Sequence, residues 1–255
     1  MTYEEYERML ERAKHLMGMA EDPAVSEDEA AVAWRRAQKT MSEFAVKDWR
    51  LYRQGRMKDP IIEENVLLLP ENAPMNRNKC ALAMIAARGN RATAFENVYK
   101  KCNGREMVVS VTFCGTERDC RQSRMIWTSM EAYRASHWRS AARQDGAKPN
   151  AKWRNIYYQD FEGRIFYLYE KLRLAREENT LTNEEENELV AVRSAQIKKF
   201  LEGLEDVKKV SHEDLPLPDG DVDAKAVKEG RRAANNVALG LDELKRRNQI
   251  ESKEA

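Results

Sequence analysis

The chain carries basic side chains at a spacing that suits contact with phosphates. Arg118, Arg121 and Arg124 recur at intervals of three residues, and Lys100 is followed directly by Lys101. An arginine guanidinium donates two parallel hydrogen bonds to a phosphate, and a lysine ammonium adds a point charge. These side chains form a candidate interface for DNA or RNA, which we assign to six positions. The six candidate contacts are Lys100, Lys101, Arg118, Arg121, Arg124 and Arg134.

The candidate interface lies in a basic segment between two acidic ones. Residues 77–154 contain 16 Lys and Arg against 6 Asp and Glu, a balance of +10. Residues 1–76 contain 11 against 15, or −4, and residues 155–255 contain 17 against 22, or −5, so the whole chain carries only +1. A concentrated positive field attracts a phosphate backbone or an acidic protein. The alternative is that the acidic flanks neutralise these charges in the folded protein.

Large aromatic side chains alternate with the basic residues and allow two interpretations. Exposed rings would give the bases of a single strand a surface on which to stack. Large rings are more often buried, so we favour a place in the core. The six rings concerned are Trp127, Tyr133, Trp138, Trp153, Tyr157 and Tyr158.

Catalytic motifs are weak in this sequence. It lacks the Walker A, dinucleotide-binding, zinc-protease and nucleophile-elbow patterns. Glu117 and Asp119 are candidate magnesium ligands for a nuclease, but no lysine and third acid accompany them on the strands, and acids also favour a helix start. The four cysteines and three histidines lack the spacing of a zinc site. We therefore predict a binding protein without cofactor or metal, with a metal-dependent nuclease as a minor alternative.

The elements that must position the basic residues form an α-β-β-α unit. Lys79–Arg88 is predicted to be a helix, and Ala94–Lys100 and Glu106–Cys114 are predicted to be paired strands. In the second strand alternate residues are apolar, so we expect one face to be buried and the other partly wet. Gly115 is expected to turn the chain. Thr116 then caps a long helix whose inner face includes Cys120, Ser123, Trp127, Met130 and Trp138.

The N-terminal region reads as a helical hairpin. Met9, Ala13 and Leu16 recur at three and four residues, which gives one helix an apolar stripe. The second helix carries a similar stripe, and the short connection makes the two helices antiparallel. We expect them to pack through Leu16, Ala30, Ala33 and Ala37.

This hairpin resembles a bacterial and bacteriophage family called domain of unknown function 2786. The family pattern is a Leu-Leu-x-Leu-Ala run followed by Glu-Ala-x-x-Ala-x-x-x-Ala-Gln-x-x-Met. The matching residues are Leu16, Met17, Met19, Ala20, Glu29, Ala30, Ala33, Ala37, Gln38 and Met41. Phe44 departs from the pattern, which has His or Tyr there. A weaker resemblance continues through Val111–Asp119, the helix around Phe161-Glu162-Gly163, and Gly230–Ala234. The resemblance implies a phage or prophage setting and assigns no catalytic residue.

The rest of the chain is predicted to be helical, including an aromatic core helix that contains Trp153, Tyr157 and Phe161. A composition of 42% hydrophobic residues suffices for a sizeable core. The predicted organisation is a helical hairpin (1–47), a linker (48–74), the basic α-β-β-α unit with its following core helices (75–207), a second linker (208–221), and a C-terminal helix with a frayed tail (222–255).

Taken together, these patterns predict a predominantly helical α+β protein. The predicted function is that of a phage-type accessory protein that binds nucleic acid or a complex that processes it. The alternative is a protein-interaction role, as an inhibitor of a host or defence protein or as a minor virion component. No apolar run approaches the roughly 18 residues of a membrane span. The first twenty residues are too charged for a secretory signal, so we expect a cytoplasmic location, which is the host-cell cytoplasm if the protein is phage-encoded.

Overall fold

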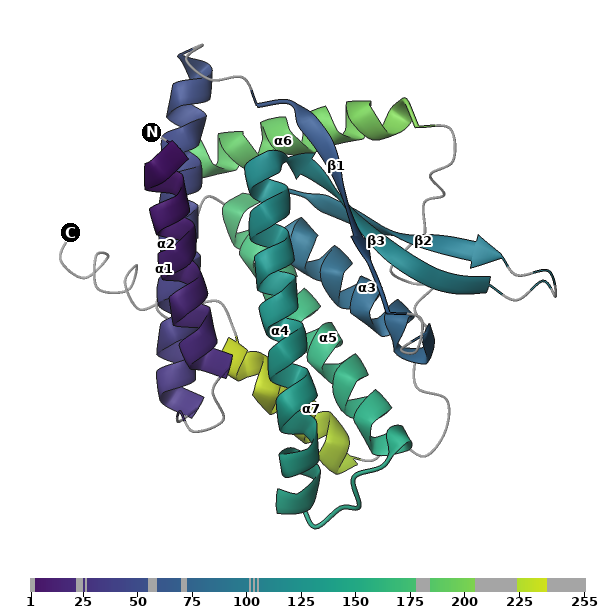
Figure 1. Ribbon diagram of the computed structural model, residues 1–255. Coiled ribbons are helices and arrows are strands. Elements are labelled where there is room, and N and C mark those ends of the chain that lie inside the picture. Colours follow the sequence, from purple (N-terminus) through teal and green to yellow (C-terminus); the bar gives the residue numbers. More distant parts are fainter. Residues whose placement is uncertain are drawn as a thin grey trace.

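The computed structural model describes residues 3–21, 25, 27–54, 59–69, 73–100, 102, 104, 106–177, 184–204 and 224–237. They form a predominantly helical α+β fold, which confirms the predicted class (Figure 1). The helices are α1 (Tyr3–Glu21), α2 (Glu27–Arg53), α3 (Ala73–Gly89), α4 (Glu117–Gln144), α5 (Ala151–Glu177), α6 (Glu184–Glu202) and α7 (Ala224–Val237). The strands are β1 (Ile61–Leu67), β2 (Thr93–Lys100) and β3 (Glu106–Thr116). Within the described ranges, no helix is long and apolar enough to cross a membrane.

The sheet is antiparallel with strand order β1-β3-β2, so β3 lies at its centre. The predicted hairpin is confirmed as β2 and β3, but β1 falls in the segment predicted to be a linker, 48–74, and α2 also extends into that segment as far as Arg53. The residues of β1 do not alternate between polar and apolar, and the strand exists because it pairs with β3 in the register Ile61↔Thr116 to Leu67↔Ser110. Gly115 does not turn the chain, because it pairs with Ile62 inside the sheet.

Strand β3 is more deeply buried than its sequence pattern predicts. Ser110 to Thr116 are all buried, so neither face of the strand is exposed to solvent at this end. Helices α3 and α4 both contact β3. The polar face tolerates burial because the Asn97 side-chain amide donates to the hydroxyl oxygens of Ser110, at 2.9 Å, and Thr112, at 2.8 Å.

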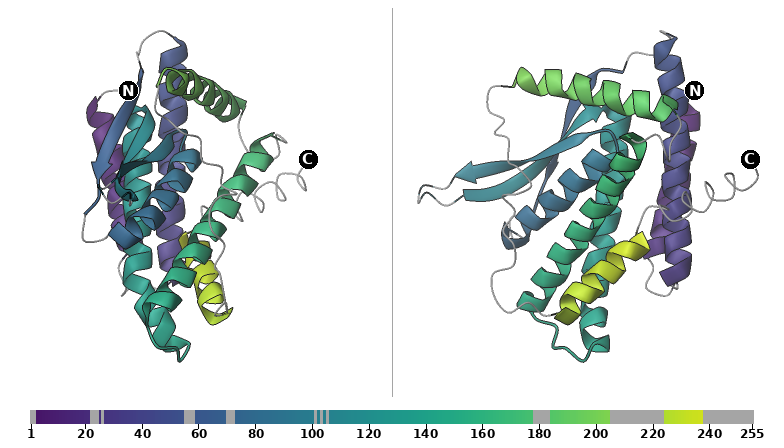
Figure 2. Two further views of the ribbon diagram at one scale, coloured as in Figure 1. Left: turned by 90° about the vertical axis from the view of Figure 1, so that its right-hand side faces the viewer. Right: turned by 180° about the vertical axis from the view of Figure 1, so that it is seen from behind.

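The predicted start of α4 is confirmed. Thr116 has extended backbone geometry, and its hydroxyl accepts a hydrogen bond from the backbone N–H of Asp119 at 3.2 Å. The predicted inner face of α4 is also confirmed, because all five of its residues are buried. Helix α5 runs beside α4 and is crossed by α7 (Figure 2). Gly230 of α7 allows this crossing, since a Cβ atom there would lie 2.6 Å from the backbone oxygen of Tyr157. The predicted linker 208–221 lies outside the described residues.

The N-terminal hairpin is confirmed as two antiparallel helices that lie side by side (Figures 1 and 2). Ala13 and Met17 of α1 and Ala33 and Ala37 of α2 are buried. Leu16 is only partly buried but packs against the same core. The side chain of Ala30, also predicted to lie at this contact, is outside the described side chains.

Replacing Ala33 with phenylalanine is expected to lower the free energy of unfolding by about 1–3 kcal/mol, because a ring cannot enter the packed contact without displacing its neighbours. Ala33 is 5% exposed. Chemical denaturation of the purified protein measures this effect. The matched control is Val32→Phe, at a 36% exposed position on the same helix, where we expect little change. Equal stability of the two variants would show that the Ala33 face is open.

Candidate nucleic-acid interface

The predicted nucleic-acid contacts do not form one surface. Lys100 is exposed at the end of β2, where the β2–β3 hairpin projects from the body of the molecule (Figure 1). Lys101 lies outside the described residues. The four arginines lie on α4, which packs against the N-terminal hairpin through α1. The sequence did not show what surrounds each of these basic residues.

Three of these arginines lie on the first turns of α4 and face other elements of the protein. The guanidiniums of Arg118 and Arg121 lie 4.8 Å and 5.9 Å from the ring centroid of Tyr6 on α1. Arg121 also pairs with Glu7 at 2.9 Å, and Arg124 pairs with Glu64 of β1 at 2.6 Å. Both acids belong to residues 1–76, so the acidic N-terminal segment neutralises part of the basic one.

The structure corrects the prediction for Arg134. Its side chain is completely buried, where Nη1 pairs with Glu162 of α5 and Nη2 with Glu131 at 2.5 Å. Its guanidinium also lies 4.3 Å from the ring centroid of Tyr158. Burial raises the pKa of Glu162 to about 7, although Arg134 acts to lower it. An arginine held in this way joins α4 to α5 and has no access to a phosphate backbone.

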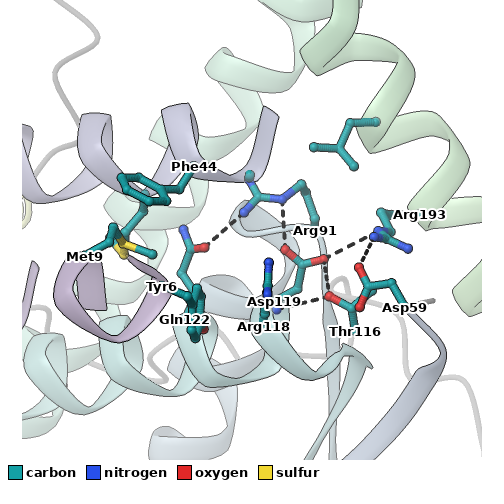
Figure 3. A pocket seen from close by; sticks show the side chains of 13 residues that line it. Tyr6, Met9, Phe44, Asp59, Arg91, Thr116, Arg118, Asp119, Gln122 and Arg193 are labelled. Atoms are coloured by element: carbon teal, nitrogen blue, oxygen red, sulfur yellow. Dashed lines mark hydrogen bonds and ion pairs between the residues drawn. The ribbon is translucent and has the colours of Figure 1, made fainter. Parts of the chain in front are cut away.

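A buried network of polar side chains lies at the start of α4 (Figure 3). Asp119 is at its centre, because Oδ1 accepts from Nε of Arg91 at 3.0 Å and Oδ2 accepts from the Thr116 hydroxyl at 2.9 Å. Nε of Arg193 lies 3.7 Å from the same Oδ2, and Arg193 also pairs with Asp59. Helix α6 is thereby tied to the segment before β1 and to the start of α4.

Arg91 holds an unusual backbone position in this network. It follows the end of α3 with φ of +62°, in the left-handed region that usually takes glycine. Its Nη2 donates to Oε1 of Gln122 at 3.1 Å, in addition to the bond to Asp119. These bonds fix its side chain, and they give a physical reason for an arginine where glycine would fit more easily.

The network gives Asp119 a structural role. Both carboxylate oxygens already accept hydrogen bonds from protein groups. The cavity among these residues has a volume of about 20 Å³, room for about one water molecule and far too little for a nucleotide. Glu117 is exposed at the first position of α4. Among the described residues, no three His, Cys, Asp or Glu side chains are grouped so that they could hold a metal ion.

The aromatic residues confirm the favoured reading of the sequence. All six rings considered as a stacking surface are buried, with exposed fractions of 6% or less. Trp127 lies against Phe113 of the sheet, and Trp153 stacks on Tyr157 within α5. These six rings belong to the hydrophobic core and are not available to bases.

Basic side chains collect where α4 ends and α5 begins. We call this region the basic tip and define it as Arg139, Arg143, Lys148, Lys152 and Arg154. No ion pair joins any of the five to an acid in the described part of the chain. Residues 139–154 contain these 5 basic residues and 1 acid, Asp145, a balance of +4. The basic tip lies at the opposite end of α4 from Arg118 (Figure 1).

Helix α7 and Trp138 also contribute to the basic tip. Lys225 of α7 donates a hydrogen bond to the backbone oxygen of Asp145 at 2.6 Å, which brings one more cation to this end of the molecule. The guanidiniums of Arg139 and Arg154 lie 4.5 Å and 5.9 Å from the ring centroid of Trp138. The six contacts assigned from the sequence include none of the five residues of the basic tip. A charge count in a window of about fifteen residues, about four helical turns, would have found them.

Comparison with known proteins identifies only the hairpin. Residues 8–47 match the model of a family described as a protein of unknown function, DUF2786. This match confirms the resemblance predicted from the residues of α1 and α2, and the weaker resemblance predicted further along the chain lies outside the matched segment. No curated protein and no solved structure matches the chain.

Proposed function

We propose that this protein is a phage-type accessory protein that binds nucleic acid through the basic tip. The observation that carries the proposal is the local charge of +4 over residues 139–154, on side chains that the described residues do not neutralise. Unneutralised cations release the counterions of a phosphate backbone, and this release drives sequence-independent binding. The family resemblance of α1 and α2 supports the proposed phage setting.

The geometry of the tip favours contact with the backbone over contact with bases. Arg139 and Arg143 are separated by one helical turn, so both side chains project from the same side of α4. Lys148 and Lys152 lie in the α4–α5 connection and the first turn of α5, and all four are exposed. Trp138 is 6% exposed, so it supports the two neighbouring guanidiniums without offering a ring face to a base.

We propose a binding role rather than catalysis. The two acids that the sequence offers as candidate ligands of a catalytic metal are Glu117 and Asp119. Asp119 is buried and bonded by Arg91 and Thr116. An acidic protein remains the alternative partner for the tip, because its carboxylates would meet the same cations.

Replacing Arg139, Arg143, Lys148 and Lys152 together with alanine is expected to weaken binding to DNA or RNA and to reduce the salt dependence. The slope of log K against log salt concentration should flatten by up to about 3–4 units, at about 0.9 per lost phosphate contact. Fluorescence anisotropy with labelled single- and double-stranded oligonucleotides, measured from about 50 mM salt upward, gives both quantities. Melting temperature should hardly change, since exposed charges contribute little to stability.

The matched control removes four exposed lysines elsewhere, Lys14, Lys39, Lys198 and Lys199. This control lowers the net charge by the same amount, so it should reproduce only the nonspecific part of the loss. Equal losses of nucleic-acid affinity in the two variants would contradict a localised interface. A wild-type protein that binds no nucleic acid at low salt would contradict the proposal altogether and favour a protein partner.

A further inference from the structure

The N-terminal hairpin carries an open groove that the proposed function does not use. The groove has a volume of about 580 Å³, within the range of about 300–1,000 Å³ typical of ligand sites. It lies where α1 begins and α2 ends, at the opposite end of the molecule from the basic tip (Figures 1 and 2). Its lining residues are Glu5, Arg8, Met9, Arg12, Thr40, Phe44, Lys47, Arg50 and Leu51. Six of these nine lie within the residues that match the family model.

The groove combines an apolar floor with two basic rims. Met9 and the partly buried Phe44 and Leu51 supply the apolar side chains. Arg8 and Arg12 come from α1, one helical turn apart, and two further cations come from α2. The lining holds four cations against one carboxylate, a balance of +3, although the hairpin belongs to the acidic segment 1–76. One of these cations, Arg8, also pairs with the exposed Glu4 at 3.9 Å.

The surroundings of the Phe44 ring argue against a nucleic-acid base as the ligand of the groove. The ammonium of Lys47 lies 5.0 Å from the centroid of the Phe44 ring, so a cation already occupies one face of that ring. The ring is also only partly exposed. An apolar floor suits aliphatic and aromatic side chains, and cations along both edges suit carboxylates at the margins of the same ligand.

The dimensions of the groove indicate a helical ligand. Its lining on α2 runs from Thr40 to Leu51, which corresponds to about 16 Å along a helix axis at about 1.5 Å per residue. This length matches about three turns of a bound helix. An amphipathic helix that lies in a groove between two helices places its apolar residues at intervals of three and four on the floor. Its flanking positions then face the two rims.

We infer that this groove binds an acidic amphipathic helix of a partner protein. The apolar stripe of that helix contacts Met9, Phe44 and Leu51, and its Asp and Glu side chains pair with the cations of the two rims. The inference concerns a different surface from the basic tip and does not depend on nucleic-acid binding there.

Selection from a displayed library of random peptides of about 14 residues, long enough for about four helical turns, tests the inference. The full-length protein is the bait. We expect the enriched peptides to carry apolar residues at i, i+3 or i+4, and i+7, flanked by Asp or Glu. A synthetic peptide of the enriched sequence should bind about tenfold more weakly to the variant Arg12→Glu/Lys47→Glu, since reversed charges repel its carboxylates. Changing the peptide's Glu to Gln should weaken binding to the wild-type protein similarly.

The matched control is Lys14→Glu/Lys39→Glu, which reverses two exposed charges on the same helices outside the groove lining, and it should retain peptide binding. Should the first variant fail to fold, Arg12→Gln/Lys47→Gln replaces it. The inference is overturned if no peptide is enriched, or if the enriched peptides lack acidic residues or bind the groove variant as tightly as the wild-type protein. Oligonucleotide binding that is lost in the groove variant and retained in the basic-tip variant would assign the groove to nucleic acid instead, which would also overturn it.

Discussion

Replacing Asp119 with alanine is expected to lower the free energy of unfolding by about 3–5 kcal/mol, the usual cost of removing one partner from a buried ion pair. The substitution leaves the guanidinium of Arg91, whose side chain is 4% exposed, without its main acceptor. It also removes the acceptor of the Thr116 hydroxyl and the second acid near Arg193. Equilibrium denaturation followed by circular dichroism measures the loss.

Two further variants distinguish the contribution of the buried network from the general effect of removing an acid at the start of a helix. Glu117→Ala removes an exposed acid from the same turn and should cost about 0.3–1 kcal/mol, as expected for the interaction with the helix dipole. Asp119→Asn keeps one acceptor oxygen, so its loss of stability should lie between those of Asp119→Ala and Glu117→Ala. If Asp119→Ala were no more harmful than Glu117→Ala, the buried network would not be what joins α4 to α3 and α6.

Replacing Arg134 with methionine is expected to destabilise the protein by about 3–5 kcal/mol at a pH at which Glu162 is ionised, because its carboxylate would then be buried without its cation. Methionine keeps much of the side-chain volume, so loss of packing contributes little. The control is Arg139→Met on the same helix, which is exposed and should change stability by less than about 0.5 kcal/mol.

The pH dependence of the Arg134→Met effect identifies its cause. Burial raises the pKa of Glu162 from 4.5 to about 7 in the folded protein. The folded protein therefore binds the Glu162 proton more tightly than the unfolded chain does. The stability that this proton contributes is fully present below the unfolded pKa of 4.5 and is lost as the pH rises through the folded pKa of about 7. In the variant the folded pKa should lie higher still, because Arg134 no longer lowers it. The loss of stability caused by Arg134→Met should then be smallest at acidic pH and should grow above about pH 7. A penalty that is constant across this range would point to packing alone.

Local structure was largely determined by the sequence alone. The stripes of α1 and α2, the strands β2 and β3, and the cap at Thr116 depend on residues close together in the chain, so spacing predicts them. The burial of the six rings also follows from residue type, since large aromatic surfaces leave water whenever a core can accept them. The family resemblance belongs to the same class of evidence, because its pattern lies within one hairpin.

Only the tertiary structure decided which basic residues remain available to a partner. A charge count adds residues along the chain, whereas neutralisation depends on distance in space. Glu7 reaches Arg121 from α1, Glu64 reaches Arg124 from β1, and Glu162 reaches Arg134 from α5. The pairing of β1 is likewise non-local, because its hydrogen bonds come from a strand about fifty residues further on. The same reason applies to the groove, since its two basic rims come from the start of α1 and the end of α2 and meet only after the hairpin closes.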